Sequence, residues 1–131
     1  MADTRQTYGE GSRFEELGGY SRAVRSGSHV AVAGTAPIEA GLTVHPGDVY
    51  GQTLFSLRKA VAAAEMLGAR AEDVVRTRIM LAVGADWEAA IRAHAEVFGA
   101  IRPANTTWFV AGFIPDVLVE VELDAVVPHT T

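Results

Sequence analysis

The sequence predicts a single α+β domain in which two helices pack on one face of a mixed β-sheet. Two segments carry apolar residues at three- and four-residue spacing behind a capping aspartate, and short β-branched or alternating segments surround them. No internal repeat or linker divides the chain. Its 131 residues suit one domain that buries about two-thirds of its unfolded surface, so residues 1–131 are taken as a single unit.

The N-terminal third predicts an arm, a hairpin and a loop. Residues 1–17 show little periodicity, and we expect a loose arm with a short strand or turn, the arm proper being residues 1–12. Residues 20–25 alternate loosely up to a Ser-Gly turn, and residues 30–33 form an apolar run. These two segments predict a hairpin whose second strand is buried on both faces. Residues 36–47 contain two prolines and two glycines, which predicts a loop.

Two helices are predicted from their caps and their apolar stripes. Asp48 can cap the first, which should end at Gly68. Its stripe consists of Leu54, Leu57, Val61 and Ala64. Asp86 can cap the second, which should end at Gly99. Its stripe consists of Trp87, Ala90, Ile91, His94 and Phe98.

Three further strands are predicted over residues 74–83, 106–111 and 118–127. The last of them alternates strictly, so its apolar and acidic residues lie on opposite faces. The apolar face consists of Val119, Val121, Leu123 and Ala125, and we expect it to meet the helices. The acidic face consists of Glu120, Glu122 and Asp124.

The acidic face has two interpretations. It can simply face solvent, as one face of many sheets does. Alternatively, it lies beside an arginine face, because Arg76 and Arg78 share one face of another strand and Arg22 follows Tyr20. Paired charges of this kind suit a subunit interface, where they fix register more than they add affinity. We therefore predict a symmetric oligomer.

Composition excludes several classes of protein. The chain has no cysteine, so it has no disulfide scaffold, catalytic thiol or thiolate metal site. Its 11 basic and 16 acidic residues give a net charge of -5, which makes nucleic acid an unlikely partner because such binders leave a basic footprint. No segment approaches a membrane span and the first residues are polar, so no membrane association and a cytoplasmic location are expected. The four histidines show no metal-ligand spacing, and we expect no metal or cofactor.

The residues alone predict a polar cleft but name no reaction. The cleft would contain Tyr20, Arg22, Asn105, Thr107 and Glu120. His94 lies on the stripe of the second helix, where a hydrogen-bonded helix-edge histidine is more common than a catalytic one. The sequence has no GxGxxG, GxxxxGK or GxSxG motif.

Four segments resemble motifs of the RidA/YjgF family and occur in the order and spacing found in that family, which is also named endoribonuclease L-PSP or liver perchloric-acid-soluble protein. They are Gly-Tyr-Ser-Arg-Ala-Val at 19–24, Ala-Gly-Thr-Ala-Pro at 33–37, Arg-Pro-Ala at 102–104 and Val-Glu-Val-Glu at 119–122, with Pro115 before the last. The similarity runs from about residue 13 to residue 127. It implies a chorismate-mutase-like α+β fold and a homotrimer with a small-molecule site in each inter-subunit cleft.

The resemblance also implies an activity, the hydrolysis of reactive enamines and imines to 2-keto acids and ammonia. Glu120 matches the glutamate that positions the attacking water, and Tyr20 matches a tyrosine of the cleft. Ala33 and Gly34 match the turn whose backbone completes the cleft. Thr107 falls where the family has a small polar residue or a cysteine.

The sequence departs from the imine-deaminase branch at the residue that clamps the substrate carboxylate. That branch has arginine directly after Pro-Ala, and this chain has Asn105, which cannot make a bidentate, charge-assisted contact. The loss should cost about 2–4 kcal/mol of substrate binding, or roughly 30- to 1,000-fold. Ile91 replaces an asparagine common in that branch, and His94 is the nearest polar group. The chain thus resembles a Rid branch outside the imine deaminases.

Three functions follow, in decreasing order of preference. The first is a hydrolase of enamine, imine or related carbonyl metabolites, with Arg22 or Arg78 replacing the missing clamp. The second is a non-catalytic trimer that binds a metabolite or docks onto a protein, which an uncharged Asn105 favours. The third is the ribonuclease of the family name, which the acidic balance and the lack of a basic stripe disfavour.

Overall fold

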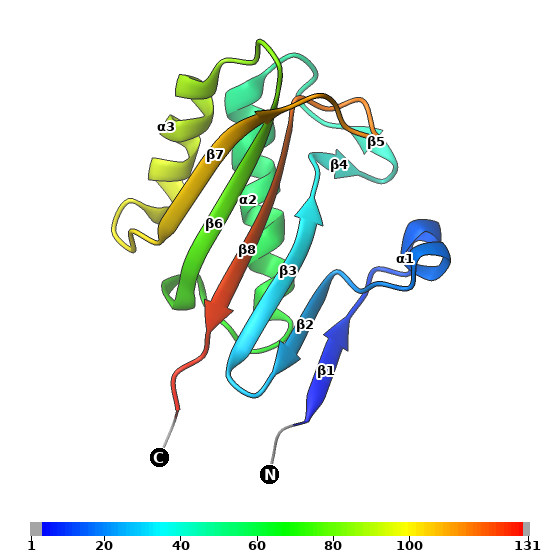
Figure 1. The fold of residues 1–131 in the computed structure, drawn as a ribbon, viewed down its shortest axis with the longest axis vertical. Coiled ribbons are helices and arrows are strands. Elements are labelled where there is room, and N and C mark those ends of the chain that lie inside the picture. The colour runs from blue at the N-terminus through cyan, green and yellow to red at the C-terminus, as the bar shows by residue number, and fades with distance from the viewer. Residues whose placement is uncertain (1–3, 130–131) are drawn as a thin grey trace.

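Six strands form one mixed sheet in the computed structural model, which describes residues 4–129 (Figure 1). From edge to edge they are β1 (Arg5–Tyr8), β2 (Ala23–Ser26), β3 (His29–Thr35), β8 (Val119–Val126), β6 (Val74–Ala82) and β7 (Ala104–Val110). All neighbours are antiparallel except β6 and β7. The predicted α+β class, the mixed sheet and the hairpin at residues 20–33 are confirmed.

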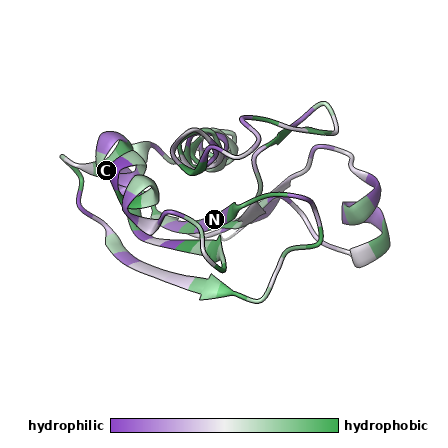
Figure 2. Ribbon diagram, turned by 90° about the horizontal axis from the view of Figure 1, so that it is seen from above, coloured by the Kyte–Doolittle hydropathy of each residue, from purple (hydrophilic) through white to green (hydrophobic). Residues whose placement is uncertain are grey.

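Two helices, α2 (Val49–Glu65) and α3 (Trp87–Phe98), cover the same face of this sheet (Figure 2). Both predicted caps are present, because the Asp48 carboxylate accepts from the Gly51 N–H and the Asp86 carboxylate accepts from the Ala89 N–H. α2 ends at Glu65, before the predicted end at Gly68, and the turn that follows contains Gly68, whose positive φ of 92° suits a residue without a Cβ. Two helices on one face of the sheet are as predicted.

The core lies between these helices and the inner side of the sheet. The inner residues of β8 are all fully buried, namely Val119, Val121, Leu123 and Ala125. Leu57 of α2, Ile79 of β6 and Phe98 of α3 fill the same layer. The strict alternation of β8 therefore has the predicted orientation, with its acidic residues on the face that no helix covers.

From residue 4 onward the predicted arm is more regular than the sequence indicated, and residues 1–3 of that arm lie outside the described residues. β1 pairs with β2, and a six-residue helix, α1 (Arg13–Gly18), follows it (Figure 1). A capping box fixes its start, since the Ser12 hydroxyl accepts from the Glu15 N–H and the Glu15 carboxylate accepts from the Ser12 N–H. Six residues are too few to show helical periodicity, which is why only a loose arm with a strand or turn was expected.

Two further details differ from the sequence analysis. The strand predicted to be buried on both faces is β3, but Ala31 and Ala33 are partly exposed while Val30 and Val32 are buried. The helices cover only one side of this strand. The predicted loop at residues 36–47 contains a small hairpin of β4 (Ile38–Glu39) and β5 (Leu42–Thr43). A single 3₁₀ turn, η1 (Ala71–Asp73), leads into β6.

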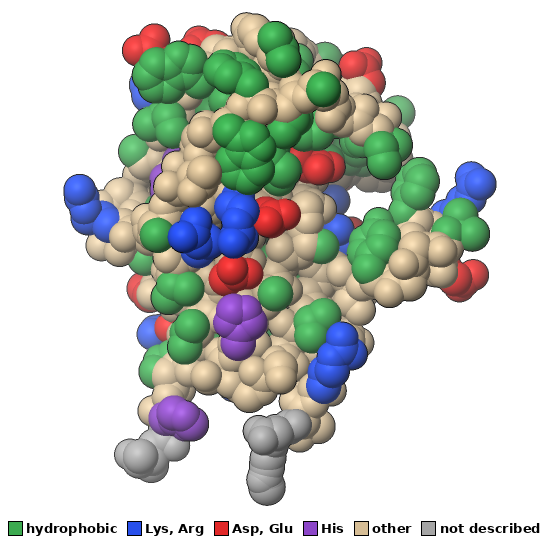
Figure 3. Space-filling model, in the orientation of Figure 1, with side chains coloured by type: hydrophobic (Ala, Val, Ile, Leu, Met, Phe, Trp, Pro, Cys, Tyr) green, Lys and Arg blue, Asp and Glu red, His purple; other side chains and the backbone are tan. Residues whose placement is uncertain are grey.

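The helix-free face carries the predicted arginine and carboxylate faces side by side. Arg78 Nη1 lies 3.2 Å from Glu122 Oε1 and 3.6 Å from Asp124 Oδ2, across the β6–β8 pair. Figure 3 shows basic and acidic side chains together in the middle of this face, with hydrophobic side chains gathered above them.

Within residues 4–129, no helix is long and apolar enough to cross a membrane.

Candidate functional site

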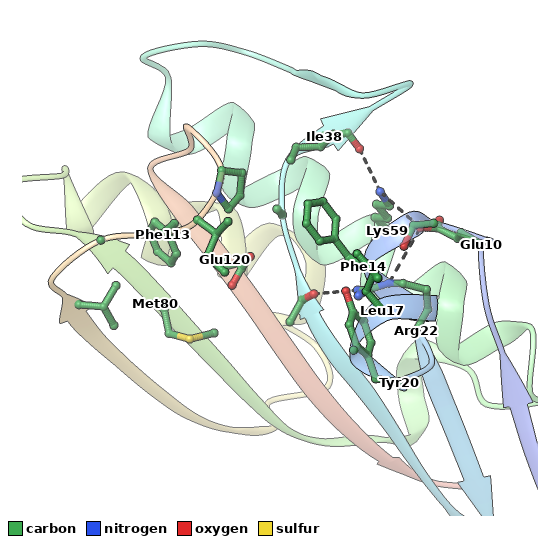
Figure 4. Close-up of a pocket in the computed structure, with 18 residues that line it drawn as sticks. Glu10, Phe14, Leu17, Tyr20, Arg22, Ile38, Lys59, Met80, Phe113 and Glu120 are labelled. Carbon is green, nitrogen blue, oxygen red and sulfur yellow. Dashed lines mark hydrogen bonds and ion pairs between the residues drawn. The ribbon is translucent and has the colours of Figure 1, made fainter.

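A hollow of about 880 Å³ opens between α1, β3 and the end of β8 (Figure 4). We call it the Glu120 hollow. Its polar side chains include Glu10, Tyr20, Arg22, Lys59 and Glu120. Its apolar side chains include Phe14, Leu17, Met80, Phe113 and Ile114. Four predicted site residues, Tyr20, Arg22, Gly34 and Glu120, therefore line one hollow.

Glu120 lies on the helix-free side of β8, opposite Met80 of β6. It is half-buried, and burial raises the pKa of its carboxyl, with a further increase from Glu122 and an opposing effect of Arg22. Among the described residues, none donates a hydrogen bond to this carboxylate. A half-buried carboxyl group that receives no hydrogen bond is a candidate general base, because its pKa lies closer to neutral pH than the pKa of an exposed glutamate does.

Gly34 gives the Glu120 carboxylate room. A methyl group on Gly34 would lie 3.3 Å from Glu120 Oε1, closer than ordinary van der Waals contact. The register of β3 against β8 shifts between Val32 and Thr35, so Ala33 and Gly34 lie in an irregular segment of the strand. This irregularity brings the backbone of the predicted turn close to the acid.

Arg22 braces this segment. Its Nη2 donates to the Gly34 carbonyl at 2.8 Å, the Thr35 hydroxyl at 2.7 Å and the Ala33 carbonyl at 3.3 Å. Its Nε lies 3.9 Å from Glu10 Oε1, and only 13% of the side chain is exposed. Of the two arginines considered as replacement clamps, Arg22 is at the hollow, whereas Arg78 pairs with the β8 carboxylates away from its lining.

Tyr20 reaches the hollow through a glycine turn at the end of α1. Gly19 adopts a left-handed conformation with φ 69°, and the Tyr20 N–H donates to the Glu15 carbonyl. This turn places the Tyr20 side chain, together with Gly18, in the lining of the hollow.

Glu10 and Lys59 were missed by the sequence analysis. Lys59 Nζ donates to the Ile38 carbonyl at 2.9 Å and lies 3.9 Å from Glu10 Oε1 (Figure 4). Glu10 thus lies close to both basic side chains of the hollow. No spacing signal could have found them, because these residues come from separate elements that only the fold brings together.

Three other predicted site residues, His94, Asn105 and Thr107, form a second group around Thr77, which we call the Thr77 cluster. The Thr77 hydroxyl, fully buried, lies 2.8 Å from His94 Nε2 and accepts from Asn105 Nδ2 at 3.1 Å. The Thr107 hydroxyl donates to Asn105 Oδ1 at 2.8 Å. Burial lowers the pKa of His94, so the neutral imidazole is favoured and its Nε2 can accept the Thr77 proton.

The Thr77 cluster lies on the opposite side of the sheet from Glu120. Asn105 pairs with Thr77 on the helix side, whereas Glu120 pairs with Met80 on the helix-free side. The single polar cleft predicted from the sequence is therefore divided within one chain. Beside the cluster is a smaller hollow of about 350 Å³, lined by Leu81, Trp87, Ile91, Asn105, Thr107, Trp108 and Phe109.

The chain matches the family model described as Endoribonuclease L-PSP over residues 10–127. It is 43% identical over 116 residues to the Streptomyces coelicolor protein SCO2049, covering 88% of this chain and 87% of that protein. It is 31% identical over 107 residues to the RutC family protein PH0854 of Pyrococcus horikoshii, covering 81% and 85%.

Solved structures show the same fold. The Mycobacterium tuberculosis protein Rv2704, described as a member of the YjgF/YER057c/UK114 family, has a TM-score of 0.85 and 41% identity, with 95% of this chain and 100% of that chain covered. The Escherichia coli YjgF product has a TM-score of 0.74 and 26% identity, with 82% and 87% covered. The chain belongs to the RidA/YjgF family, the family whose model carries the name endoribonuclease L-PSP.

Proposed function

We propose that this chain hydrolyses enamine- or imine-like small molecules, with Glu120 as the group that directs water. The observation that carries the proposal is the half-buried Glu120 carboxylate, which receives no hydrogen bond from residues 4–129, in the largely apolar wall of a hollow of about 880 Å³. A hollow of this size accommodates a small metabolite. The raised pKa of Glu120 suits a group that must both accept and return a proton.

The proposed reaction has two steps. Water adds to the carbon of the protonated C=N group while Glu120 accepts one of its protons, which gives a neutral carbinolamine. Glu120 then returns the proton to nitrogen, and the C–N bond breaks as the hydroxyl oxygen forms the C=O bond. The hydroxyl proton passes through Glu120 to the departing ammonia, so a carbonyl compound and ammonium leave. Water and imine supply every atom of the products, so Glu120 ends in its starting state.

We also propose that the hollow is completed by a second copy in a homotrimer. Support comes from apolar side chains that one copy leaves exposed on β7 and α3, namely Trp87, Ile91, Trp108 and Phe109. The edge strand β7 and the helix-free face are likewise uncovered in the single chain. In such a trimer, Asn105 of the partner subunit would approach the Glu120 hollow. Sedimentation velocity tests this assembly, and a monomer at micromolar concentration would contradict it.

The activity is tested with imines made in place from a matched pair of precursors. An amine oxidase produces the imine of 2-phenylethylamine, and an amino-acid oxidase produces that of phenylalanine. We expect the chain to accelerate ammonium release from at least one of them and Glu120→Gln to lower the catalysed rate by about 10²–10⁴-fold. Rates equal to the buffer control with both imines would overturn the proposal.

A second candidate is a binding protein without turnover, and the state of Asn105 favours it. Its amide is held by Thr77 and Thr107 within its own chain, as expected for a residue with a structural role. A thermal-shift screen with keto acids, amino acids and small amides separates the two functions. Strong stabilisation by a ligand combined with imine hydrolysis at the buffer rate would favour binding.

A further inference from the structure

We propose that the Glu120 hollow selects substrates in which a positively charged nitrogen adjoins an apolar group and no carboxylate is present. The substrate class is the iminium ions of simple amines rather than those of amino acids. This inference rests on the proposed function and specifies the substrate of the same site.

The first observation is the surroundings of the free carboxylate. Glu120 is flanked by Met80 and Phe113, and Figure 4 shows these three side chains together on one side of β3. The charge of Arg22 also acts on this carboxyl, but Arg22 donates its hydrogen bonds to Ala33, Gly34 and Thr35 and not to Glu120. A half-buried carboxylate beside apolar groups is poorly solvated and attracts a cation more strongly than an exposed one does. A ligand cation is therefore the natural partner of Glu120.

The second observation is the position of the basic groups. Arg22, Lys59 and Glu10 lie together on the other side of β3 in the same view. Arg22 Nη2 is bonded to three oxygens of the chain, and Lys59 Nζ is bonded to the Ile38 carbonyl. A ligand carboxylate would have to compete with Glu10 and these internal acceptors, at a guanidinium that is only 13% exposed.

The third observation concerns Asn105, at the position to which the resemblance assigns carboxylate binding, and Arg78, which was considered as its replacement. Asn105 replaces the arginine, and its amide oxygen and nitrogen both have partners in the Thr77 cluster. Arg78, the other candidate clamp, contacts both Glu122 and Asp124. Asn105 carries no charge, and the charge of Arg78 is paired with carboxylates of the same chain, so neither residue is available to bind a ligand carboxylate.

The apolar side chains define the rest of the substrate. Phe14 and Leu17 of α1 and Ile114 of the β7–β8 connection are strongly exposed and line the hollow. An aromatic or branched substituent would cover them, which supplies affinity through apolar burial. For such an iminium, R–CH=NH₂⁺ and water give R–CHO and NH₄⁺, so charge and atoms balance without any further reactant.

The test uses stable amines that differ only in the carboxylate. Binding of 2-phenylethylamine and of L-phenylalanine is measured by calorimetry with the wild type, Glu120→Gln and Glu16→Gln. Glu16→Gln is the matched control, because it removes the same charge from an exposed position on α1 outside the lining. We expect the amine to bind at least about 10-fold more tightly than the amino acid, and Glu120→Gln alone to reduce this preference to within about threefold.

Three outcomes would overturn the inference: phenylalanine binding as tightly as the amine, neither compound binding at 10 mM (roughly the weakest affinity calorimetry resolves), or Glu16→Gln reducing the preference as much as Glu120→Gln. The proposed hydrolysis fails separately, if neither imine is turned over although the Glu120-dependent preference for the amine is observed. Conversely, turnover of the phenylalanine imine in preference to the phenylethylamine imine retains the hydrolase and refutes this substrate class.

Discussion

The Glu120 hollow and the Thr77 cluster occupy opposite faces of the same sheet, and their polar atoms are partnered differently. In the cluster, Thr77, His94, Asn105 and Thr107 satisfy one another through three hydrogen bonds. In the hollow, the Glu120 carboxylate receives no hydrogen bond from the described residues. A polar group that its own chain satisfies is explained by stability, whereas a half-buried charge left without a partner calls for a ligand.

Removing the Thr77 hydroxyl should change stability more than any other substitution considered below. Thr77→Val should lower the free energy of unfolding by about 1–3 kcal/mol, because it leaves His94 Nε2 and the Asn105 amide without their buried partner. Urea unfolding at a fixed protein concentration measures the change. Imine hydrolysis by the folded variant should stay within about threefold of the wild type if the cluster is structural.

Thr53→Val is the matched control. Its hydroxyl is also fully buried, but it donates only to the Val49 carbonyl within α2. That carbonyl keeps its helical hydrogen bond, so the loss should be about 1 kcal/mol smaller than at Thr77. Equal losses at the two sites would contradict a cooperative role for the Thr77 cluster.

Part of this comparison could be predicted from the sequence. Asp48 and Asp86 predicted where the two helices begin. The alternation of residues 119–126 predicted that Glu120 lies on the face of the sheet away from the core. The pairing partners of each strand could not be predicted in this way. The parallel register of β6 and β7 puts Asn105 beside Thr77. Alternation along one strand does not show which residues of the neighbouring strand lie beside its own, so this pair could not be predicted.

The next prediction uses pH, since the two regions should respond with opposite signs. Burial raises the pKa of Glu120 above its ordinary value near 4.5, so the unfolded chain releases this proton first and stability falls as pH rises through that window. Burial lowers the pKa of His94 below 6.5, so the unfolded chain binds a proton first and stability falls as pH drops below 6.5.

Glu120→Gln and His94→Gln isolate these two contributions. The melting temperature of each variant minus that of the wild type is measured from pH 4.5 to 8. The difference should become more positive with rising pH for Glu120→Gln and with falling pH for His94→Gln. If the melting-temperature difference changed with pH in the same direction for both variants, the opposite pKa shifts assigned to Glu120 and His94 would be contradicted.

The smallest expected effect concerns the space beside Glu120. Gly34→Ala would place a methyl group 3.3 Å from Glu120 Oε1, and the carboxylate would have to move by a few tenths of an ångström. We expect kcat/KM for imine hydrolysis to fall by about 2- to 10-fold with little change in stability. Gly112→Ala is the control in the same lining, since its methyl group would have no neighbour within 4 Å. Equal activity of the two variants would show that the position of Glu120 is not critical.

This contact could not be predicted from the sequence, because it depends on an irregularity in β3. The apolar run at residues 30–33 predicted a strand, but not the register shift between Val32 and Thr35 that brings Gly34 against Glu120. The same limit applies to Glu10, whose position depends on the capping box of α1 and on chain reversal after β1. Local patterns thus give the elements, and the site follows from how separate elements meet.

Lys59 has a practical consequence for work on this protein. It is the only lysine in the sequence, and it lies in the wall of the Glu120 hollow with 30% of its side chain exposed. An amine-reactive fluorophore would therefore have a single ε-amino target in the whole chain, a few ångströms from Glu10 and at the rim of the site. The sequence thus offers a single lysine side chain for attaching an optical reporter of ligand entry, with no engineered cysteine required.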